Sequence, residues 1–261
     1  MKKIKQQGLF LKLSIIAIVL SSFLLIKDDK PTWYIIGDST VRNTGRPQCG
    51  WGEMINQFVD TMQLNISNQA MAGRSTRTFI KEGRWDKVMS AIKPGDFLIM
   101  QFGHNEGSKP DTSKAGYRGV LRGIGDETVQ LTWKDSTLET VHTYGWYLRK
   151  FVKEAKAKGA IPIIASMIPR NDWKDGKVVR ANTNYGKWAM EIAEQEGAYF
   201  VDLNGITADK YDIMGADSVK AFFPSEHTHT NIAGATINAA SVAEGIKGIK
   251  DCPLNKYLLK G

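Results

Sequence analysis

Five short apolar segments recur along the chain, and each is followed by polar or glycine-rich residues. The segment 96–102 is hydrophobic almost throughout, which is typical of a parallel strand that is covered on both faces. The first segment stops at a Gly-Asp-Ser turn, so this strand ends by presenting a hydroxyl group. The predicted strands are residues 33–36, 63–67, 96–102, 161–167 and 199–203.

Between these segments, apolar residues recur at helical spacing. Tyr144, Tyr147, Leu148 and Phe151 follow the i, i+3, i+4, i+7 pattern, and Gly159 closes this helix. The other predicted helices are residues 54–58, a stretch that follows the turn at 73–77 and ends at 92, residues 185–193, and residues 231–247. Strands that alternate with helices, without repeats or hairpin signals, predict a parallel sheet with helices on both faces.

We therefore expect an α/β fold: one three-layer, flavodoxin-like domain of residues 31–250 with a five-stranded parallel sheet in the order 2-1-3-4-5. Residues 106–140 are long for a connection and rich in Gly, Ser, Asp and Lys. We interpret them as an inserted lobe near the active site, with a disordered, solvated excursion as the alternative. Residues 251–261 are taken as a C-terminal tail.

The N-terminal 30 residues have the composition of an export signal. Lys2, Lys3 and Lys5 precede an apolar run at 13–26, which is short for a membrane-spanning helix. We expect export to the periplasm or the medium, with either a cleaved signal peptide or an uncleaved N-terminal anchor. Membrane attachment is expected only through this segment.

The distribution of charge and the positions of the two cysteines indicate whether to expect a nucleic-acid partner or a disulfide. The 261 residues carry a formal net charge of +8, and half of this excess lies in the first 30 residues. No basic run or recognition motif is present, so we expect no nucleic-acid partner. Cys49 and Cys252 should lie at opposite ends of the predicted sheet, and we expect no disulfide between them.

Chemically suggestive residues follow the predicted strands. Ser39, Gly73 and Asn105 come after strands one, two and three, and His229 lies in the loop before the last helix. The carboxyl ends of parallel strands share one edge of a sheet, so we expect these four residues to meet there. A serine hydroxyl attacks an ester when an imidazole accepts its proton. The N–H groups of Ser39 and Gly73 and the amide of Asn105 would form an oxyanion hole.

The chain contains two neighbouring histidines before the last helix, and placement favours these as the source of the base. His227 and His229 could also be read as two metal ligands, but no third Cys, His or carboxylate cluster supports a metal site. We therefore expect neither a metal nor a cofactor. A Gly-x-Ser-x-Gly elbow is absent from the sequence, which argues against the α/β-hydrolase lipase fold.

These blocks resemble those of the SGNH (GDSL-type) hydrolases, in which Ser, Gly, Asn and His carry the roles named above. The closer likeness is to the rhamnogalacturonan acetylesterases of carbohydrate esterase family twelve, and it covers residues 32–247. The blocks are 37–41 (GDSTV), 50–53 (GWGE), 68–77 (NQAMAGRSTR), 102–105 (FGHN), and 223–224 (FP) through 233–235 (AGA). The resemblance implies deacetylation of pectic polysaccharide by Ser39 and His229, without a metal or cofactor.

One position departs from this pattern. The family usually has an Asp three residues before the catalytic His, and here that position is Glu226. Glutamate orients the histidine in some triads of other folds, and we favour Glu226 as the acid. The alternatives are Asp202, at the end of the fifth strand, or a weakened dyad.

The expected partner is acetylated pectic polysaccharide, bound by a chain that we expect to be monomeric. Guanidinium groups match the carboxylates of galacturonate, so Arg74 and Arg77 are candidate substrate-binding residues, with structural loop ties as the alternative. Trp51 is a candidate sugar-stacking platform. Asp38 and His104 complete the substrate-binding set, although His104 can instead pack or hydrogen-bond beneath the site.

Two other functions remain open from sequence. The broader GDSL class includes lipases, thioesterases and acetylxylan esterases. A catalytically impaired carbohydrate-binding homologue would keep the groove and lose turnover because of Glu226.

Overall fold

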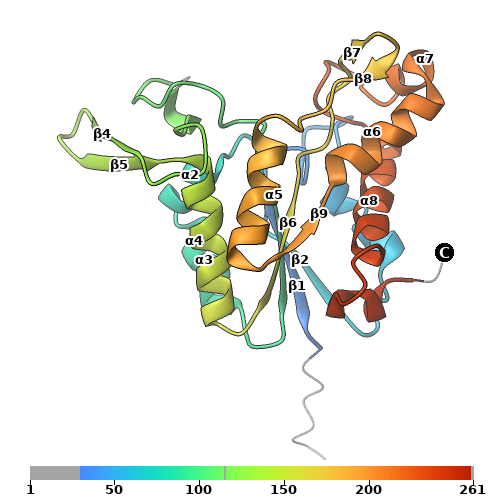
Figure 1. Ribbon diagram of the computed structural model, residues 1–261, viewed down its shortest axis with the longest axis horizontal. Coiled ribbons are helices and arrows are strands. Elements are labelled where there is room, and N and C mark those ends of the chain that lie inside the picture. The colour runs from blue at the N-terminus through green and yellow to red at the C-terminus, as the bar shows by residue number, and fades with distance from the viewer. Residues whose placement is uncertain (1–29, 115, 260–261) are drawn as a thin grey trace, which may run out of the picture. The chain divides into compact units, whose positions relative to one another are not determined.

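The five apolar segments pair into one parallel sheet in the computed structural model, which describes residues 30–114 and 116–259 (Figure 1). The strand order is β2-β1-β3-β6-β9, which is the predicted order 2-1-3-4-5. The three-layer α/β prediction is thus confirmed. The strands are β1 (Thr32–Gly37), β2 (Asn65–Asn68), β3 (Phe97–Gln101), β6 (Ile161–Ala165) and β9 (Tyr199–Val201).

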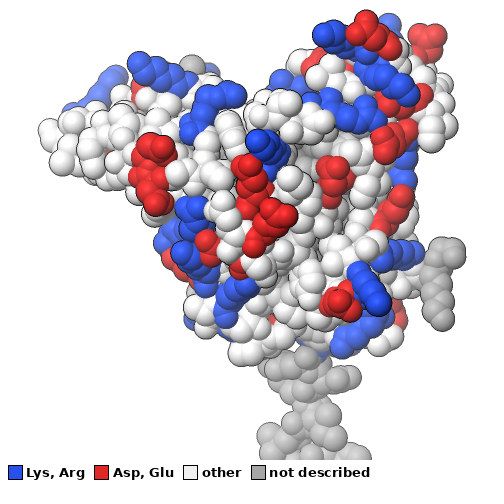
Figure 2. All heavy atoms as spheres, viewed as in Figure 1, with Lys and Arg blue, Asp and Glu red and all other residues white. Residues whose placement is uncertain are grey.

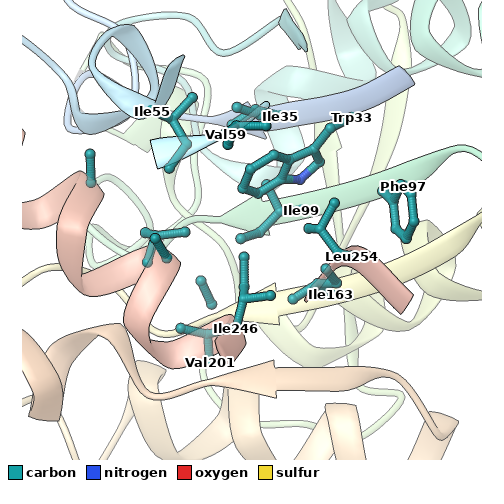
Figure 3. Close-up of a cluster of buried hydrophobic side chains, with 14 of the residues drawn as sticks. Trp33, Ile35, Ile55, Val59, Phe97, Ile99, Ile163, Val201, Ile246 and Leu254 are labelled. Carbon is teal, nitrogen blue, oxygen red and sulfur yellow. The ribbon is translucent and has the colours of Figure 1, made fainter. Parts of the chain in front are cut away.

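Side chains alternate between the two faces of the sheet, and each face is covered by its own layer. Trp33 and Ile35 of β1 belong to a core cluster with the C-terminal helix α8 (Ile232–Lys247), as Figure 3 shows. Tyr34 and Ile36 point to the opposite cluster. Its helices are α2 (Thr76–Lys81), α3 (Arg84–Ala91), α4 (Tyr144–Ala157) and α5 (Tyr185–Glu196).

Helix boundaries follow local capping signals. The Thr143 hydroxyl accepts a hydrogen bond from the Trp146 N–H at the start of α4, and Gly197 ends α5 in the left-handed conformation. The stretch predicted up to residue 92 is broken, because Gly83 adopts φ 67° between α2 and α3. The predicted helix at 54–58 is instead two 3₁₀ turns, η1 (Trp51–Glu53) and η2 (Ile55–Phe58).

Two groups of elements outside the sheet lie near the carboxyl ends of its strands (Figure 1). The described residues of the lobe, 106–114 and 116–140, include a turn, η3 (Gly116–Arg118), and one strand, β4 (Thr128–Thr132), which pairs with β5 (Leu138–His142). The second group contains elements that the sequence did not predict. These are β7 (Trp173–Lys174), β8 (Lys177–Val178), α6 (Leu203–Met214) and α7 (Ala216–Lys220).

The described part of the predicted tail, residues 251–259, packs against the domain. Leu254 and Tyr257 of η4 (Pro253–Tyr257) are buried in the core beneath α8. Cys49 and Cys252 are both free and buried, as expected. Among residues 30–114 and 116–259, no helix has the length and apolarity needed to cross a bilayer. The predicted signal or anchor lies outside the described residues.

Candidate active site

Ser39 lies in a tight turn that the end of β1 forces on the chain. A Cβ atom on Gly37 would lie 2.5 Å from the Val41 side chain, so only glycine fits where the strand meets the turn. The Asp38 carbonyl accepts the N–H of Val41, and the Asp38 carboxylate accepts the N–H and hydroxyl of Thr40. These bonds fix the turn, which holds the Ser39 hydroxyl at the carboxyl edge of the sheet.

The imidazole of His229 links Ser39 to an acid. His229 Nε2 is 2.7 Å from Ser39 Oγ, although 190 residues separate them in sequence, and His229 Nδ1 is 2.7 Å from Glu226 Oε1. When Nδ1–H donates to the carboxylate, Nε2 is the acceptor for the serine proton. Glu226 also accepts the N–H groups of His229, at 2.6 Å, and of Thr228, at 2.8 Å.

The hydrogen-bond donors around Glu226 stabilise the negative charge of its carboxylate. Partial burial alone would raise its pKa, but the backbone donors and the imidazole together lower the pKa below the ordinary glutamate value. The carboxylate is therefore ionised at neutral pH. Asp202, the alternative acid, accepts hydrogen bonds from Ser166 and Gly205 and caps α6, and no hydrogen bond joins it to His229 in the described part of the chain.

The segment that carries His229 is tied to its surroundings on both sides. The His227 carbonyl accepts the Asn171 N–H at 2.7 Å. On the other side, the Thr230 carbonyl accepts the Cys49 N–H at 2.7 Å, and the Thr230 hydroxyl donates to the Cys49 carbonyl. The imidazole is therefore held near Ser39 by cross-links to the loops after β1 and β6.

The three groups expected to form an oxyanion hole keep hydrogens that the described part of the chain does not use, and their role stays a prediction. The N–H groups of Ser39 and Gly73 donate to no acceptor within residues 30–114 and 116–259, so both are free to bind a ligand. Gly73 has φ 77°, a conformation that favours glycine. Asn105 Nδ2 gives one hydrogen to the Arg74 carbonyl, and Asn105 Oδ1 accepts from Arg118 at 2.8 Å. The second Nδ2 hydrogen remains available.

A buried acid that sequence reasoning missed holds two of these loops together. One oxygen of Glu106 accepts the N–H of Thr76 at the start of α2, and the other accepts the N–H groups of Gly103 and Asn105. Burial raises the pKa of Glu106 to about 8, against the opposing effect of these donors. The only feature of the sequence that pointed to Glu106 was its position directly after Asn105.

Two residues assigned to substrate binding are inaccessible. Asp38 is fully buried, hydrogen-bonds to Thr40 and has its pKa raised to about 6 by burial. Trp51 is also fully buried, and its indole N–H donates to Gln101 at 3.0 Å. Neither can contact a sugar, and both assignments were wrong: these side chains support the serine turn from beneath.

The two arginines that were predicted to bind substrate differ in how far they are exposed to solvent. Arg77 is 1% exposed and forms a bidentate pair with Glu139, which ties α2 to the lobe, so its substrate assignment was also wrong. Burial alone would raise the pKa of Glu139, but hydrogen bonds from Arg77, Lys81 and Trp133 and the charge of Arg77 together lower this pKa to about 2. Arg74 is partly exposed and pairs with Glu82 at 2.9 Å, so its role in binding stays a prediction.

His104 lies beside the candidate oxyanion donors. It is half-buried, but both ring nitrogens are inaccessible and have no hydrogen-bond partner in the described residues. Burial lowers its pKa to about 3, so the ring is neutral.

No group of three His, Cys, Asp or Glu side chains within residues 30–114 and 116–259 is placed to hold a metal ion.

The chain is similar to known esterases over most of its length. The model of the GDSL-like Lipase/Acylhydrolase family matches residues 35–237. A rhamnogalacturonan acetylesterase of Emericella nidulans is 33% identical over 82% of this chain and 84% of its own. A probable rhamnogalacturonan acetylesterase of Bacillus subtilis is 27% identical over 87% of this chain and 97% of its own.

Solved structures share the fold. The Bacillus subtilis protein YxiM matches with a TM-score of 0.67 and 24% identity, over 85% of this chain and 58% of that chain. An acetylxylan esterase of Geobacillus stearothermophilus matches with a TM-score of 0.53 and 18% identity, over 82% of this chain and 93% of that chain.

Proposed function

Because the chain belongs to the GDSL-like lipase/acylhydrolase family and is a carboxylic ester hydrolase, we propose that it removes O-acetyl groups from rhamnogalacturonan. The hydrogen-bonded line from Ser39 through His229 to Glu226 is the observation that carries this proposal. The identity of 33% to a relative named for this activity supports the choice of substrate.

Acylation starts at the serine hydroxyl. His229 Nε2 accepts the proton as Ser39 Oγ attacks the acetyl carbonyl carbon. The carbonyl oxygen gains negative charge and is stabilised by the N–H groups of Ser39 and Gly73 and by the Asn105 amide. When the C–O bond to the sugar breaks, His229 gives its proton to the departing sugar oxygen, and an acetyl-serine remains.

Deacylation uses the same groups in the reverse direction. A water molecule attacks the acetyl-serine carbonyl while His229 accepts one of its protons. The tetrahedral intermediate collapses, acetate leaves, and the proton returns to Ser39. In both halves Glu226 stabilises the imidazolium and keeps Nδ1 protonated, so that Nε2 faces the reacting oxygen.

The additional methylene of glutamate, compared with aspartate, is accommodated by the loop. The two backbone donors on Glu226 fold its side chain back toward residues 228 and 229, which brings one carboxylate oxygen to His229 Nδ1. We infer that Glu226 serves as the third member of the triad and that turnover is retained. This inference argues against an impaired binding protein.

Acetate release from a panel of esters tests the proposal. The wild-type protein should release acetate from acetylated rhamnogalacturonan faster than from acetylated xylan, with little hydrolysis of long-chain esters. Ser39→Ala should abolish release, whereas Ser90→Ala, at an exposed position of α3, is the matched control and should retain it. Faster turnover of acetylated xylan or long-chain esters would overturn the substrate assignment. Sugar binding without any Ser39-dependent hydrolysis would overturn the enzyme mechanism.

We also propose that the protein is exported. The lysines at positions 2, 3 and 5 and the apolar run at 13–26 support this, since together they have the pattern of a signal segment. Fractionation of expressing cells should place the protein outside the cytoplasm, and N-terminal sequencing would distinguish a cleaved signal from an anchor. Retention of the full chain in the soluble cytoplasmic fraction would contradict export.

A further inference from the structure

The inserted lobe is held against α2 by a buried arginine. The Nε and Nη2 atoms of Arg77 donate to the two carboxylate oxygens of Glu139 at 2.9 and 2.8 Å. The remaining nitrogen, Nη1, donates to the carbonyls of Gly116 at 3.0 Å and Gly119 at 3.1 Å. These two carbonyls flank the last two residues of η3, and Glu139 lies on β5. One guanidinium group therefore fixes both the turn and the hairpin of the lobe to the domain.

The turn η3 brings a second arginine to the candidate oxyanion hole. Arg118 Nη1 donates to Asn105 Oδ1 at 2.8 Å, and a Cβ atom on Gly73 would lie 3.9 Å from the same nitrogen. An arginine side chain has donors and no acceptor, so the Asn105 atom that faces it has to be the oxygen. The Asn105 NH₂ group is thereby turned away from Arg118. One of its hydrogens binds the Arg74 carbonyl, and the other has no acceptor in the described part of the chain.

The remaining side chain of η3 is anchored to the same carboxylate. Tyr117 packs edge-on against Trp133, with ring centroids 5.8 Å apart, and the indole N–H of Trp133 donates to Glu139 at 2.8 Å. Lys81 of α2 donates to Glu139 at 2.7 Å. Figure 2 shows that the surface is hollowed beside the lobe, toward the segment that carries β7 and β8. The lobe is open on that side, so contacts at its base have to hold η3 in place.

We propose that the lobe positions the Asn105 amide through Arg118, an inference that rests on the proposed function and on the oxyanion role expected for this amide. Arg77 and Glu139 are positioning residues in the same sense, because they hold the turn that carries Arg118. Without this link the amide is free to rotate by half a turn and to present its oxygen, which repels a negatively charged oxyanion. The lobe is thus part of the catalytic apparatus as well as a rim of the site.

Steady-state hydrolysis of p-nitrophenyl acetate tests this link, because this small ester carries no sugar that could contact the lobe. Arg118→Ala should lower kcat about tenfold and Glu139→Gln about 3- to 10-fold, with little change in KM, as is usual within one hydrogen-bond network. Arg118→Lys keeps a donor and should lose less. Glu196→Gln is the matched control and should retain kcat. The Glu196 side chain is 15% exposed, like that of Glu139, and pairs with Arg149 at 3.0 Å. No hydrogen bond joins it to η3 or Asn105 within the residues that the structure describes.

The same changes in an Asn105→Ala background separate positioning from a merely structural role. If Arg118 and Glu139 act through Asn105, neither change should lower kcat by more than about twofold once the amide is gone. A further loss as large as in the wild-type background would overturn the inference, as would an unchanged kcat in Glu139→Gln and Arg118→Ala. An unchanged kcat in Asn105→Ala itself would overturn both the oxyanion role and the inference. Counting competent sites by phosphonate labelling of Ser39 corrects for any unfolded fraction.

The outcomes also separate this inference from the proposed function. Losses that disappear in the Asn105→Ala background, together with no acetate release from acetylated rhamnogalacturonan by the wild type, would uphold the role of the lobe and reject only the proposed substrate. Acetate release from that polysaccharide, with losses that persist in the Asn105→Ala background, would uphold the substrate and reject only the role of the lobe.

Discussion

Replacing Glu226 with glutamine tests the electrostatic support of the imidazole. The variant keeps the size of the side chain but removes its charge. At the 2.7 Å separation of Nδ1 and Oε1, two unit charges interact by about 3–6 kcal/mol for an effective dielectric constant of about 20–40. The Glu226 side chain is 40% exposed, so solvent screening favours the lower part of this range. Each step of about 1.4 kcal/mol changes a rate tenfold, so the lower part of this range corresponds to a fall in kcat of about 100- to 1,000-fold.

Steady-state kinetics on a soluble acetyl ester would measure this loss, and KM should change little because Glu226 acts through His229. Glu226→Ala should lose at least as much, since it leaves the imidazole and two backbone N–H groups without their acceptor. Asp202→Asn is the matched control, because this acid caps α6 and has no hydrogen bond to His229. A fall of less than tenfold in Glu226→Gln, or a larger fall in Asp202→Asn, would refute the reasoning.

Three more outcomes can be measured. Asn105→Ala should lower kcat about 100- to 1,000-fold because an oxyanion donor is lost, and a change in KM alone would contradict that role. Arg118→Ala should lower kcat about tenfold with little change in KM, because the Asn105 amide loses the donor that orients it; unaltered kcat would argue against this support. In urea titrations the free energy of unfolding should fall as pH rises from about 6.5 to 8. The raised pKa of Glu106 (about 8) means that the folded chain retains a proton which the unfolded chain loses in this range, so its contribution declines as pH rises. Below pH 6.5 the lowered pKa of His104 (about 3) acts in the opposite direction, because there the unfolded chain binds a proton that the folded chain does not. Glu106→Gln should flatten this decline, and an unchanged slope would reject the assignment.

The strands β1, β3 and β6 could be predicted from sequence because they are buried on both faces. Such strands are continuous apolar runs, and the turn residues after them show where each one ends. The elements that escaped prediction depend on local details that periodicity does not report. Helix α6 begins directly after β9 because the Asp202 carboxylate caps it, although the apolar pattern predicts a strand through residue 203. The 3₁₀ turns after Gly50 reflect tight packing, since a Cβ there would lie 2.2 Å from the Val41 backbone.

The proposed reacting residues were accessible to sequence reasoning because each follows a strand or precedes a capped helix. Residue type alone could not tell which neighbouring side chains reach solvent. Arg77 and Trp51 have the chemistry of sugar-binding residues, but a bidentate pair with Glu139 and a hydrogen bond to Gln101 keep them inside.

The attachments of the His229 segment run mainly through main-chain atoms. Both the link from Asn171 to His227 and the link from Cys49 to Thr230 use a peptide N–H and a carbonyl, with a single hydroxyl added. The hydrogen-bonding character of the side chains at 49 and 171 is therefore irrelevant to where the proton acceptor sits. Substitutions at these two positions that leave the backbone in place should therefore preserve the 2.7 Å contact between His229 Nε2 and Ser39 Oγ.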